Sequence, residues 1–448
     1  MDNASRIPSR TLQARFARKA ASAAIGALIL GTMGAYAHAE GITTSPYLLG
    51  DWGGWRTRLA NDGVSFSLGY TGELAHNFTG GDKRITRYAD QWALGATLDL
   101  DKLVGWKGAT FQTTFTERNG RNLGADANIG NNMLLQEVYG RGQTVHLTDF
   151  WLDQKLFDDK LSVKLGRMTV GEDFASFSCD FQNLTFCGSQ PGNLVGSYWV
   201  NWPTSQWAAR VKLTTSKETY AEVGVYQVNP QYVNDDYART YGWTLQNPSG
   251  TTGALIPLEG GWTPKVNGLP GSYKAGVWYN TSSGKDLYYD VNNNPRALTG
   301  LAALNHGGQY GAYINFQQQI TGEPGGRGAS LFLNISQADR ATAQTDRQIA
   351  MGVQYKGPFN RPNDSIGFGI GATHNNGRYA DYVNQLNALT GSHNVAGNGY
   401  EYASEVYYSW SPIPSVFMRL NLQYVVHPGG TSLNHNAFVV GLKTGITF

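Results

Sequence analysis

Arginine and acidic side chains gather in two stretches of this chain, around positions 117–141 and 167–173. An arginine and a carboxylate that face each other across a gap can bind neighbouring hydroxyl groups through paired hydrogen bonds. An aromatic face can also stack on the C–H side of a sugar ring. Our candidates for a constriction that binds such a solute are Arg118, Arg121, Arg167, Glu172 and Asp173. Solvated charge in a surface loop is the alternative for each of them.

The N-terminus has the pattern of an export signal. Five basic residues, the last of them Lys19, precede the apolar segment 20–35, which leads to Ala37-His38-Ala39. We expect residues 1–39 to be removed as a signal peptide, because the apolar segment is shorter than the ~20 residues of the alternative, a membrane anchor. Removal takes five of 35 basic and one of 33 acidic residues, so the formal charge of +2 becomes −2 and gives no argument for nucleic-acid binding.

The only two cysteines, Cys179 and Cys187, lie in the 36-residue stretch 169–204. Because an exported protein meets oxidising conditions, we expect a disulfide between them. Metal binding by the pair is disfavoured, since no histidine or third cysteine lies nearby. A loop of this length is expected to fold onto another part of the protein, and a stapled loop that folds inward would narrow a pore.

Alternation of apolar and polar residues organises the rest of the chain. The stretch 436–448 shows it most clearly, with Leu442 on an apolar face, Lys443 on the other face and Phe448 at the end. Such a stretch is typical of the closing strand of an outer-membrane barrel. The weakest predicted strand is 254–263, because it contains Pro257. Sixteen strands are predicted, at 64–74, 91–100, 108–118, 145–157, 160–168, 205–214, 219–228, 254–263, 273–281, 309–320, 329–337, 346–356, 365–375, 400–410, 415–426 and 436–448.

The connections between these strands sort by length. Seven short turns alternate with eight mostly longer connections rich in Gly and Asn. This pattern predicts an all-β, sixteen-stranded antiparallel transmembrane barrel with both chain termini on one side of the membrane. A soluble sandwich or propeller would have shorter strands and unsorted loops. Tryptophans near strand ends, such as Trp106, Trp202, Trp262 and Trp410, would form interfacial girdles.

The polar face of these strands would line a pore. It carries both signs of charge together with amides, which suits neutral polyhydroxylated solutes better than an anion channel. Charges paired across the wall of a generic water-filled lumen are the alternative. Arg167 departs from the inward alternation, which indicates a bulge or a strand that has already ended. The charged inward residues are Glu73, Asp99, Arg118, Asp153, Lys164, Arg210, Lys212, Glu222, Lys274, Glu401, Glu405, Arg419 and Lys443.

Other classes of protein receive little support from the sequence. A mean hydropathy of −0.35 excludes a helical membrane protein. No nucleophile elbow, zinc-protease motif or phosphate-binding loop is present, so we expect no enzyme, no cofactor and no metal. A hydrolase at the barrel rim would have to use Asp381 with His374, or His427 with His435. A scaffold or adhesin barrel is disfavoured by the polar lumen.

The stretch 45–63 predicts one short amphipathic helix, with Asp51 as N-cap and Gly63 as its stop. Its motif YLLGDWGGWRTRL resembles the N-terminal signature of the OprB carbohydrate-selective porins. The motifs GRMTVGEDFASF and CDFQNLTFCGSQPGN resemble a loop of the same family. With GWTPK at 261–265, GSYKAGVWY at 271–279 and the terminal Phe, the likeness covers essentially all of 45–448.

This resemblance implies a channel of the bacterial outer membrane that prefers glucose and other monosaccharides. It also implies an eyelet formed by two external loops, 119–144 and 169–204. We therefore expect a signal peptide (1–39), a periplasmic or plug segment (40–63) and a porin barrel (64–448), with small carbohydrates and outer-membrane lipid as partners. A general diffusion porin that selects only by size stays the alternative, and both a monomer and a homotrimer stay open.

Overall fold

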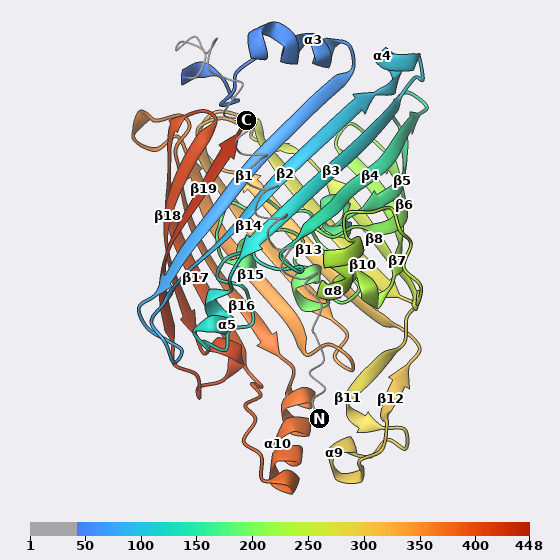
Figure 1. Cartoon of the computed structure of the whole chain (residues 1–448), viewed down its shortest axis with the longest axis vertical. Coiled ribbons are helices and arrows are strands. Elements are labelled where there is room, and N and C mark those ends of the chain that lie inside the picture. The colour runs from blue at the N-terminus through green and yellow to red at the C-terminus, as the bar shows by residue number, and fades with distance from the viewer. Residues whose placement is uncertain (1–42) are drawn as a thin grey trace, which may run out of the picture.

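The computed structural model describes residues 43–448, so the predicted signal peptide lies outside the described residues. Sixteen antiparallel strands form a closed barrel, and the two-residue β9 (Lys265–Val266) brings the sheet to 17 strands (Figure 1). The ring closes where β1 (Val64–Asn77) pairs with β19 (Ala437–Thr447). The predicted fold class is confirmed. The strands between them are β2 (Thr86–Asp99), β3 (Ala109–Gly120), β4 (Val145–Leu156), β5 (Leu161–Met168), β6 (Gln206–Thr214), β7 (Thr219–Val228), β8 (Gly253–Trp262), β10 (Leu269–Asn280), β13 (Gln309–Gln319), β14 (Gly328–Ala338), β15 (Thr345–Lys356), β16 (Ser365–Asn375), β17 (Tyr400–Ile413) and β18 (Val416–Val426).

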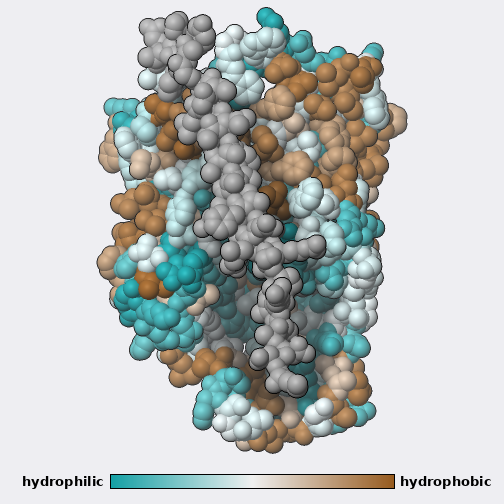
Figure 2. Space-filling view, in the orientation of Figure 1, coloured by the Kyte–Doolittle hydropathy of each residue, from teal (hydrophilic) through white to brown (hydrophobic). Residues whose placement is uncertain are grey.

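The two faces of the wall follow the predicted alternation. Leu442 pairs with Leu74 on one side and with Leu420 on the other, and these side chains point outward, where Leu420 is 56% exposed. The next residues along these strands, Lys443 and Glu73, pair with each other and point inward, and both side chains are buried. Figure 2 shows hydrophobic residues over much of the upper part of the outer wall. Apolar side chains therefore face lipid, and charged ones face the lumen.

β8 contains Pro257 and is the strand whose prediction had the least support. Pairing with β7 passes from Val223–Leu258 directly to Tyr226–Leu255, so the residue without an N–H group sits at a break in this register. Its other neighbour, β10, pairs through Trp278 opposite Pro257. The strand survives because the break affects only one of its two edges.

Short turns and long loops lie at opposite ends of the barrel (Figure 1). The turn end carries α4 (Leu100–Val104), whereas the loop end carries α10 (Gly377–Thr390) and a separate hairpin of β11 (Gly284–Asp290) and β12 (Ala303–His306). The elements at the loop end lie within two connections, 282–308 and 376–399, that were predicted as plain loops. Asn376 caps α10 by accepting from the amide of Arg378, which is a local signal that the period-two pattern does not reveal. The remaining short helices are α5 (Leu123–Asp126), α6 (Val170–Asp173), η2 (Leu184–Phe186), α7 (Pro191–Leu194), η3 (Pro230–Val233), α8 (Asp235–Tyr241), α9 (Arg296–Thr299), η4 (Pro358–Asn360) and η5 (Pro428–Gly430).

The N-terminal segment forms η1 (Trp52–Gly54) and α3 (Trp55–Asn61) beside the closing seam. The amide of Leu48 donates to the Thr447 carbonyl at 2.7 Å, and the Arg56 guanidinium donates to the Phe448 carbonyl at 2.7 Å. Asp51 is the N-cap of η1, as predicted for the start of this helical segment, whereas the N-cap of α3, which follows directly, is Gly54. The Asp51 carboxylate still accepts from the amide of Thr57 at 2.8 Å, because the intervening 3-10 turn brings it back over the helix start. Among the described residues, no helix has the length and apolar character needed to cross a membrane.

Much of the buried apolar core lies inside the barrel rather than between layers. The loop between β5 and β6, residues 169–205, buries Phe174 and Trp199 against inward aromatic residues of β7, β10 and β13. Between these two residues of the loop, Phe181 and Phe186 pack on Phe332 and other inward residues. The loop is thus fixed across the lumen by apolar contacts on two sides, as its length predicts.

Candidate functional site

Inward glutamates hold the 169–205 loop inside the barrel. Glu405 on β17 accepts from the amides of Gln182 and Asn183 at 2.9 and 2.7 Å. Glu259 on β8 accepts from the amide of Ala175 at 2.8 Å. A buried carboxylate that accepts backbone N–H groups is stabilised, and the amides it accepts from would otherwise lack partners. These glutamates fix the loop rather than line open space.

The loop between β3 and β4, residues 121–144, is held in the same way. Glu401 on β17 accepts from the amides of Asn132 and Met133 at 2.6 and 3.2 Å. The two inserted loops also bond to each other. The Glu137 amide donates to the Gln182 carbonyl at 3.0 Å, and the Leu184 amide donates to the Leu134 carbonyl at 2.9 Å. The loops therefore form one connected body within the lumen.

Lys443 joins this body to the wall. Its ammonium group donates to the Glu137 carboxylate at 2.9 Å, and to the carbonyls of Cys179 and Phe181 at 2.9 and 3.0 Å. It also lies 3.2 Å from the carboxylate of Glu73. One side chain on the closing strand thus contacts both loops and the first strand.

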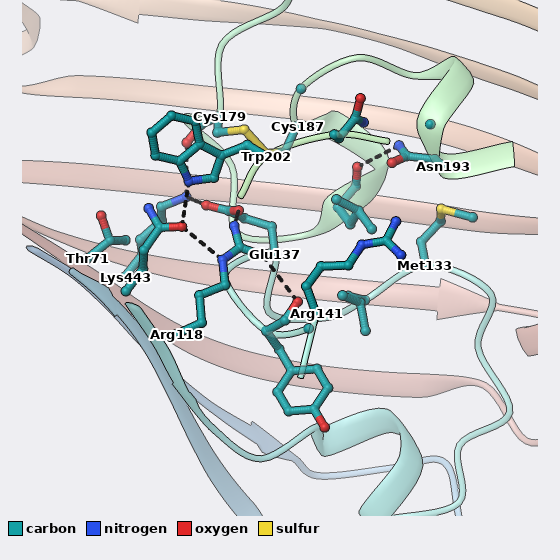
Figure 3. Close-up of a pocket in the computed structure, with 18 of the residues that line it drawn as sticks. Thr71, Arg118, Met133, Glu137, Arg141, Cys179, Cys187, Asn193, Trp202 and Lys443 are labelled. Atoms are coloured by element: carbon teal, nitrogen blue, oxygen red, sulfur yellow. Dashed lines mark hydrogen bonds and ion pairs between the residues drawn. A yellow bond between two sulfur atoms is a disulfide. The ribbon is translucent and has the colours of Figure 1, made fainter. Parts of the chain in front are cut away.

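A cavity of about 670 Å³ opens between the two loops and the barrel wall (Figure 3). This volume lies within the ~300–1,000 Å³ range of small-molecule sites. The cavity has aromatic, amide and charged walls. Its principal polar and aromatic lining residues are Gln91, Arg118, Asn132, Glu137, Tyr139, Arg141, Asp180, Asn193, Asn201, Trp202, Asp235, Phe417, Arg419 and Lys443.

A second cavity, of about 520 Å³, lies toward the short-turn end and shares Asp180 with the first. The Asp180 carboxylate lies 3.6 Å from the guanidinium of Arg419, and it accepts from the Gln354 amide at 3.0 Å. Desolvation inside the barrel is the largest influence and acts to raise the pKa of Asp180. The charges of Arg419 and Lys443, together with the hydrogen bonds from Gln354 and Ser178, outweigh it and hold this pKa below its ordinary value. Asp180 and Arg419 therefore form a charged pair at the boundary between the two cavities.

A hydrogen-bonded chain positions the aromatic wall of the first cavity, which lies between the two loops. The Trp202 indole N–H donates to the side-chain oxygen of Gln91 at 2.8 Å, and Arg118 Nε donates to the same oxygen at 2.8 Å (Figure 3). The Arg118 guanidinium also lies 4.0 Å from the Glu137 carboxylate. An indole face, an arginine and a carboxylate thus lie along one side of the cavity.

Of the predicted constriction residues, Arg118 is the one that lines this cavity. Asp173 pairs with Lys164 at 2.6 Å and with Arg210 at 3.6 Å, which anchors the start of the 169–205 loop to β5 and β6. Glu172 accepts from the Thr169 hydroxyl at 2.9 Å within the same helical turn, α6. Neither carboxylate borders the cavity.

Arg121 and Arg167 lie away from the cavity. Arg121 is 67% exposed and pairs with Asp126 at 2.7 Å, and hydrogen bonds from Arg87 and Arg121 hold the pKa of Asp126 below its ordinary value. Arg167 remains within β5, so its strand has not ended. Its guanidinium donates to the Ser205 carbonyl at 3.0 Å and lies over the Tyr232 ring, 5.2 Å from its centroid.

Several lining residues carried a sequence signal that did not select them. Arg419 and Lys443 are among the inward charges found by alternation, whereas Trp202 was assigned to an interfacial girdle. That assignment was wrong, because Trp202 precedes β6 and its indole N–H is bonded inside the lumen. The Cys179–Cys187 disulfide is present as predicted, and both cysteines border the cavity.

Comparison with known proteins agrees with this arrangement. The family model described as "Carbohydrate-selective porin, OprB family" matches residues 83–448. Porin B of Pseudomonas aeruginosa is 45% identical over 442 residues, which cover 95% of this chain and 96% of that protein. The chain belongs to the OprB family of carbohydrate-selective porins. Family membership makes it a channel of the bacterial outer membrane rather than an enzyme.

Two further relatives extend the OprB assignment. Putative porin QuiX of Acinetobacter baylyi is 33% identical over 447 residues, which cover 95% of this chain and 98% of that protein. The high-pH structure of Pseudomonas putida OprB matches with a TM-score of 0.87 at 45% identity, and the match covers 91% of this chain and 99% of that one. The OprB likeness therefore includes the barrel as a whole.

Proposed function

We propose that this porin lets neutral monosaccharides of the glucose type diffuse passively through the constriction beside Asp180. The observation that carries the proposal is the lining of the first cavity, where Trp202 and the Arg118–Glu137 pair lie on one side and the Arg419–Asp180 pair lies at the boundary with the second cavity. An indole face stacks on sugar C–H groups, and paired donors and acceptors exchange hydrogen bonds with hydroxyl groups.

The local pairing of charges supports a neutral solute. Arg118, Arg419 and Lys443 each lie within 4.0 Å of a carboxylate, so their fields are largely compensated. A sugar hydroxyl can donate to the carboxylate of such a pair and accept from its cation, whereas a small inorganic ion would meet both signs at once. Selection then depends on hydrogen-bond pattern as well as on size.

Ion current through the porin in planar bilayers tests this proposal. Glucose should reduce the current in a saturable way, because an occupied constriction excludes ions. A channel that selects only by size would show no saturable reduction, and this result would contradict the proposal.

The variant Arg118→Gln should raise the glucose concentration for half-maximal block by about 3- to 10-fold, the effect of losing one typical hydrogen bond, worth ~1 kcal/mol. Arg121→Gln is the matched control, since Arg121 is exposed outside the cavity. Equal sensitivity to glucose in the two variants would exclude Arg118 as a sugar contact.

A further inference from the structure

Arg141 differs from the other cations that line the first cavity. Arg118, Arg419 and Lys443 each have a carboxylate partner within 4.0 Å. Among residues 43–448, no carboxylate lies within that distance of Arg141, and its guanidinium donates a hydrogen bond to the Gly196 carbonyl at 3.2 Å. In Figure 3 its guanidinium lies apart from Glu137 and Lys443. The cavity therefore contains one cation whose charge is not locally paired.

The backbone holds Arg141 in an unusual conformation. Its φ is +66°, and the flanking Gly140 and Gly142 have φ values of +120° and +90°. Glycine adopts these angles readily, whereas arginine does so at a cost, so the turn stores strain at the one position that carries a long charged side chain. Strain of this kind persists where the surrounding structure imposes it, and such positions cluster at ligand sites.

The charge of Asp235 acts on Arg141, but from beyond ion-pair distance. The Asp235 carboxylate lies 3.9 Å from Arg239 and is 58% exposed, so it compensates the charge of Arg141 only in part. The Arg141 guanidinium therefore lacks a close carboxylate within the cavity and is available to one that a solute carries.

We propose that the cavity also binds and passes sugars that bear one carboxylate, with Arg141 pairing with that group. This inference rests on the proposed function, because the sugar ring would use the neutral-sugar contacts while the carboxylate uses Arg141. Arginine suits the task, since its fork of N–H groups matches the two oxygens of a carboxylate. A singly charged sugar acid fits a cavity with a single unpaired cation.

Glucose and glucuronate make a matched pair of solutes, because they share a ring and differ by a carboxylate at C6. Uptake of each radiolabelled sugar into proteoliposomes should be saturable for the wild-type porin. Arg141→Asn should lower glucuronate uptake by about five- to tenfold, the loss of one close ion pair, and change glucose uptake less than about twofold. Asparagine is chosen because it tolerates positive φ and so removes the charge without new strain.

Controls separate charge from shape. Arg141→Lys keeps the charge and should retain most glucuronate uptake, and Arg121→Gln should behave as wild type. Equal loss of both sugars in Arg141→Asn, or full glucuronate uptake in that variant, would overturn the inference but not the proposed function, which rests on glucose uptake by the wild-type porin. A wild-type porin that takes up neither sugar would instead overturn the proposed function and this inference with it.

Discussion

Lys443 illustrates how a single side chain organises the constriction. Its ammonium group contacts the carboxylates of Glu73 and Glu137 and the carbonyls of Cys179 and Phe181. Loss of one partner from a buried charge pair is costly because the other charge stays behind without compensation. Glu73 pairs with this cation, and Glu137 has only the more distant Arg118 besides it, so removal of Lys443 should loosen the loops and the wall together.

Replacement of Lys443 by Met tests this dependence. The variant should lose about 3–5 kcal/mol of unfolding free energy in urea, the cost of breaking a buried pair, and its current should be blocked less by glucose. Lys102→Met is the control, because the Lys102 side chain is about half exposed at the turn end. If glucose blocked the Lys443 variant as strongly as wild type, the lysine would not position the constriction.

Among the elements, strands could be predicted from the sequence far better than loops. A period of two identified all sixteen barrel strands and placed Arg118, Arg419 and Lys443 on the lumen side. Residues in the inserted loops follow no period, so their direction depends on contacts with distant strands. Arg121 shows the limit, because it lies one residue beyond β3 yet points into solvent.

The same reasoning explains why Asp180 and Arg141 were not selected. Asp180 reaches the boundary between the two cavities because Glu405 and Lys443 hold the chain immediately around it. These contacts span more than 200 positions. Arg141 enters the cavity through a glycine-flanked turn with positive φ angles. Neither arrangement leaves a signal in residue spacing.

The disulfide gives a prediction at the level of one element. Cys179 and Cys187 close a short ring within a loop that is already fixed by Glu259, Glu405 and two apolar clusters. Replacing both cysteines by serine should cost about 2–3 kcal/mol of loop stability and leave the barrel folded. Hydrogen exchange should rise around residues 179–187, and the open-channel current should become noisier.

Wild-type porin treated with a reducing agent offers an independent comparison for the double variant. It should show the same faster exchange at 179–187, with unchanged protection of the barrel strands. Faster exchange across the strands as well would mean that the disulfide stabilises the whole barrel rather than the loop.

For the whole molecule, the orientation of the wall decides stability in the membrane. Leu420 faces outward on β18 and Leu433 is exposed in the connection to β19. Arginine at Leu420 should therefore cost about 2–4 kcal/mol of unfolding free energy in lipid vesicles, because its charge would enter hydrocarbon. The same substitution at Leu433 should change it by less than about 0.5 kcal/mol, since that side chain meets water. Equal effects at the two positions would contradict the assigned lipid face.

The seam between β1 and β19 has a consequence for how this porin is made. The Arg56 guanidinium and the Phe448 carbonyl that it contacts are separated by 392 positions. Until the last strand emerges from the export machinery, the free edge of β1 presents unpaired backbone groups that can recruit the wrong partner. Biogenesis therefore has to shield that edge while some fifteen hairpins and loops are sorted, and the ring locks only when its final residues arrive.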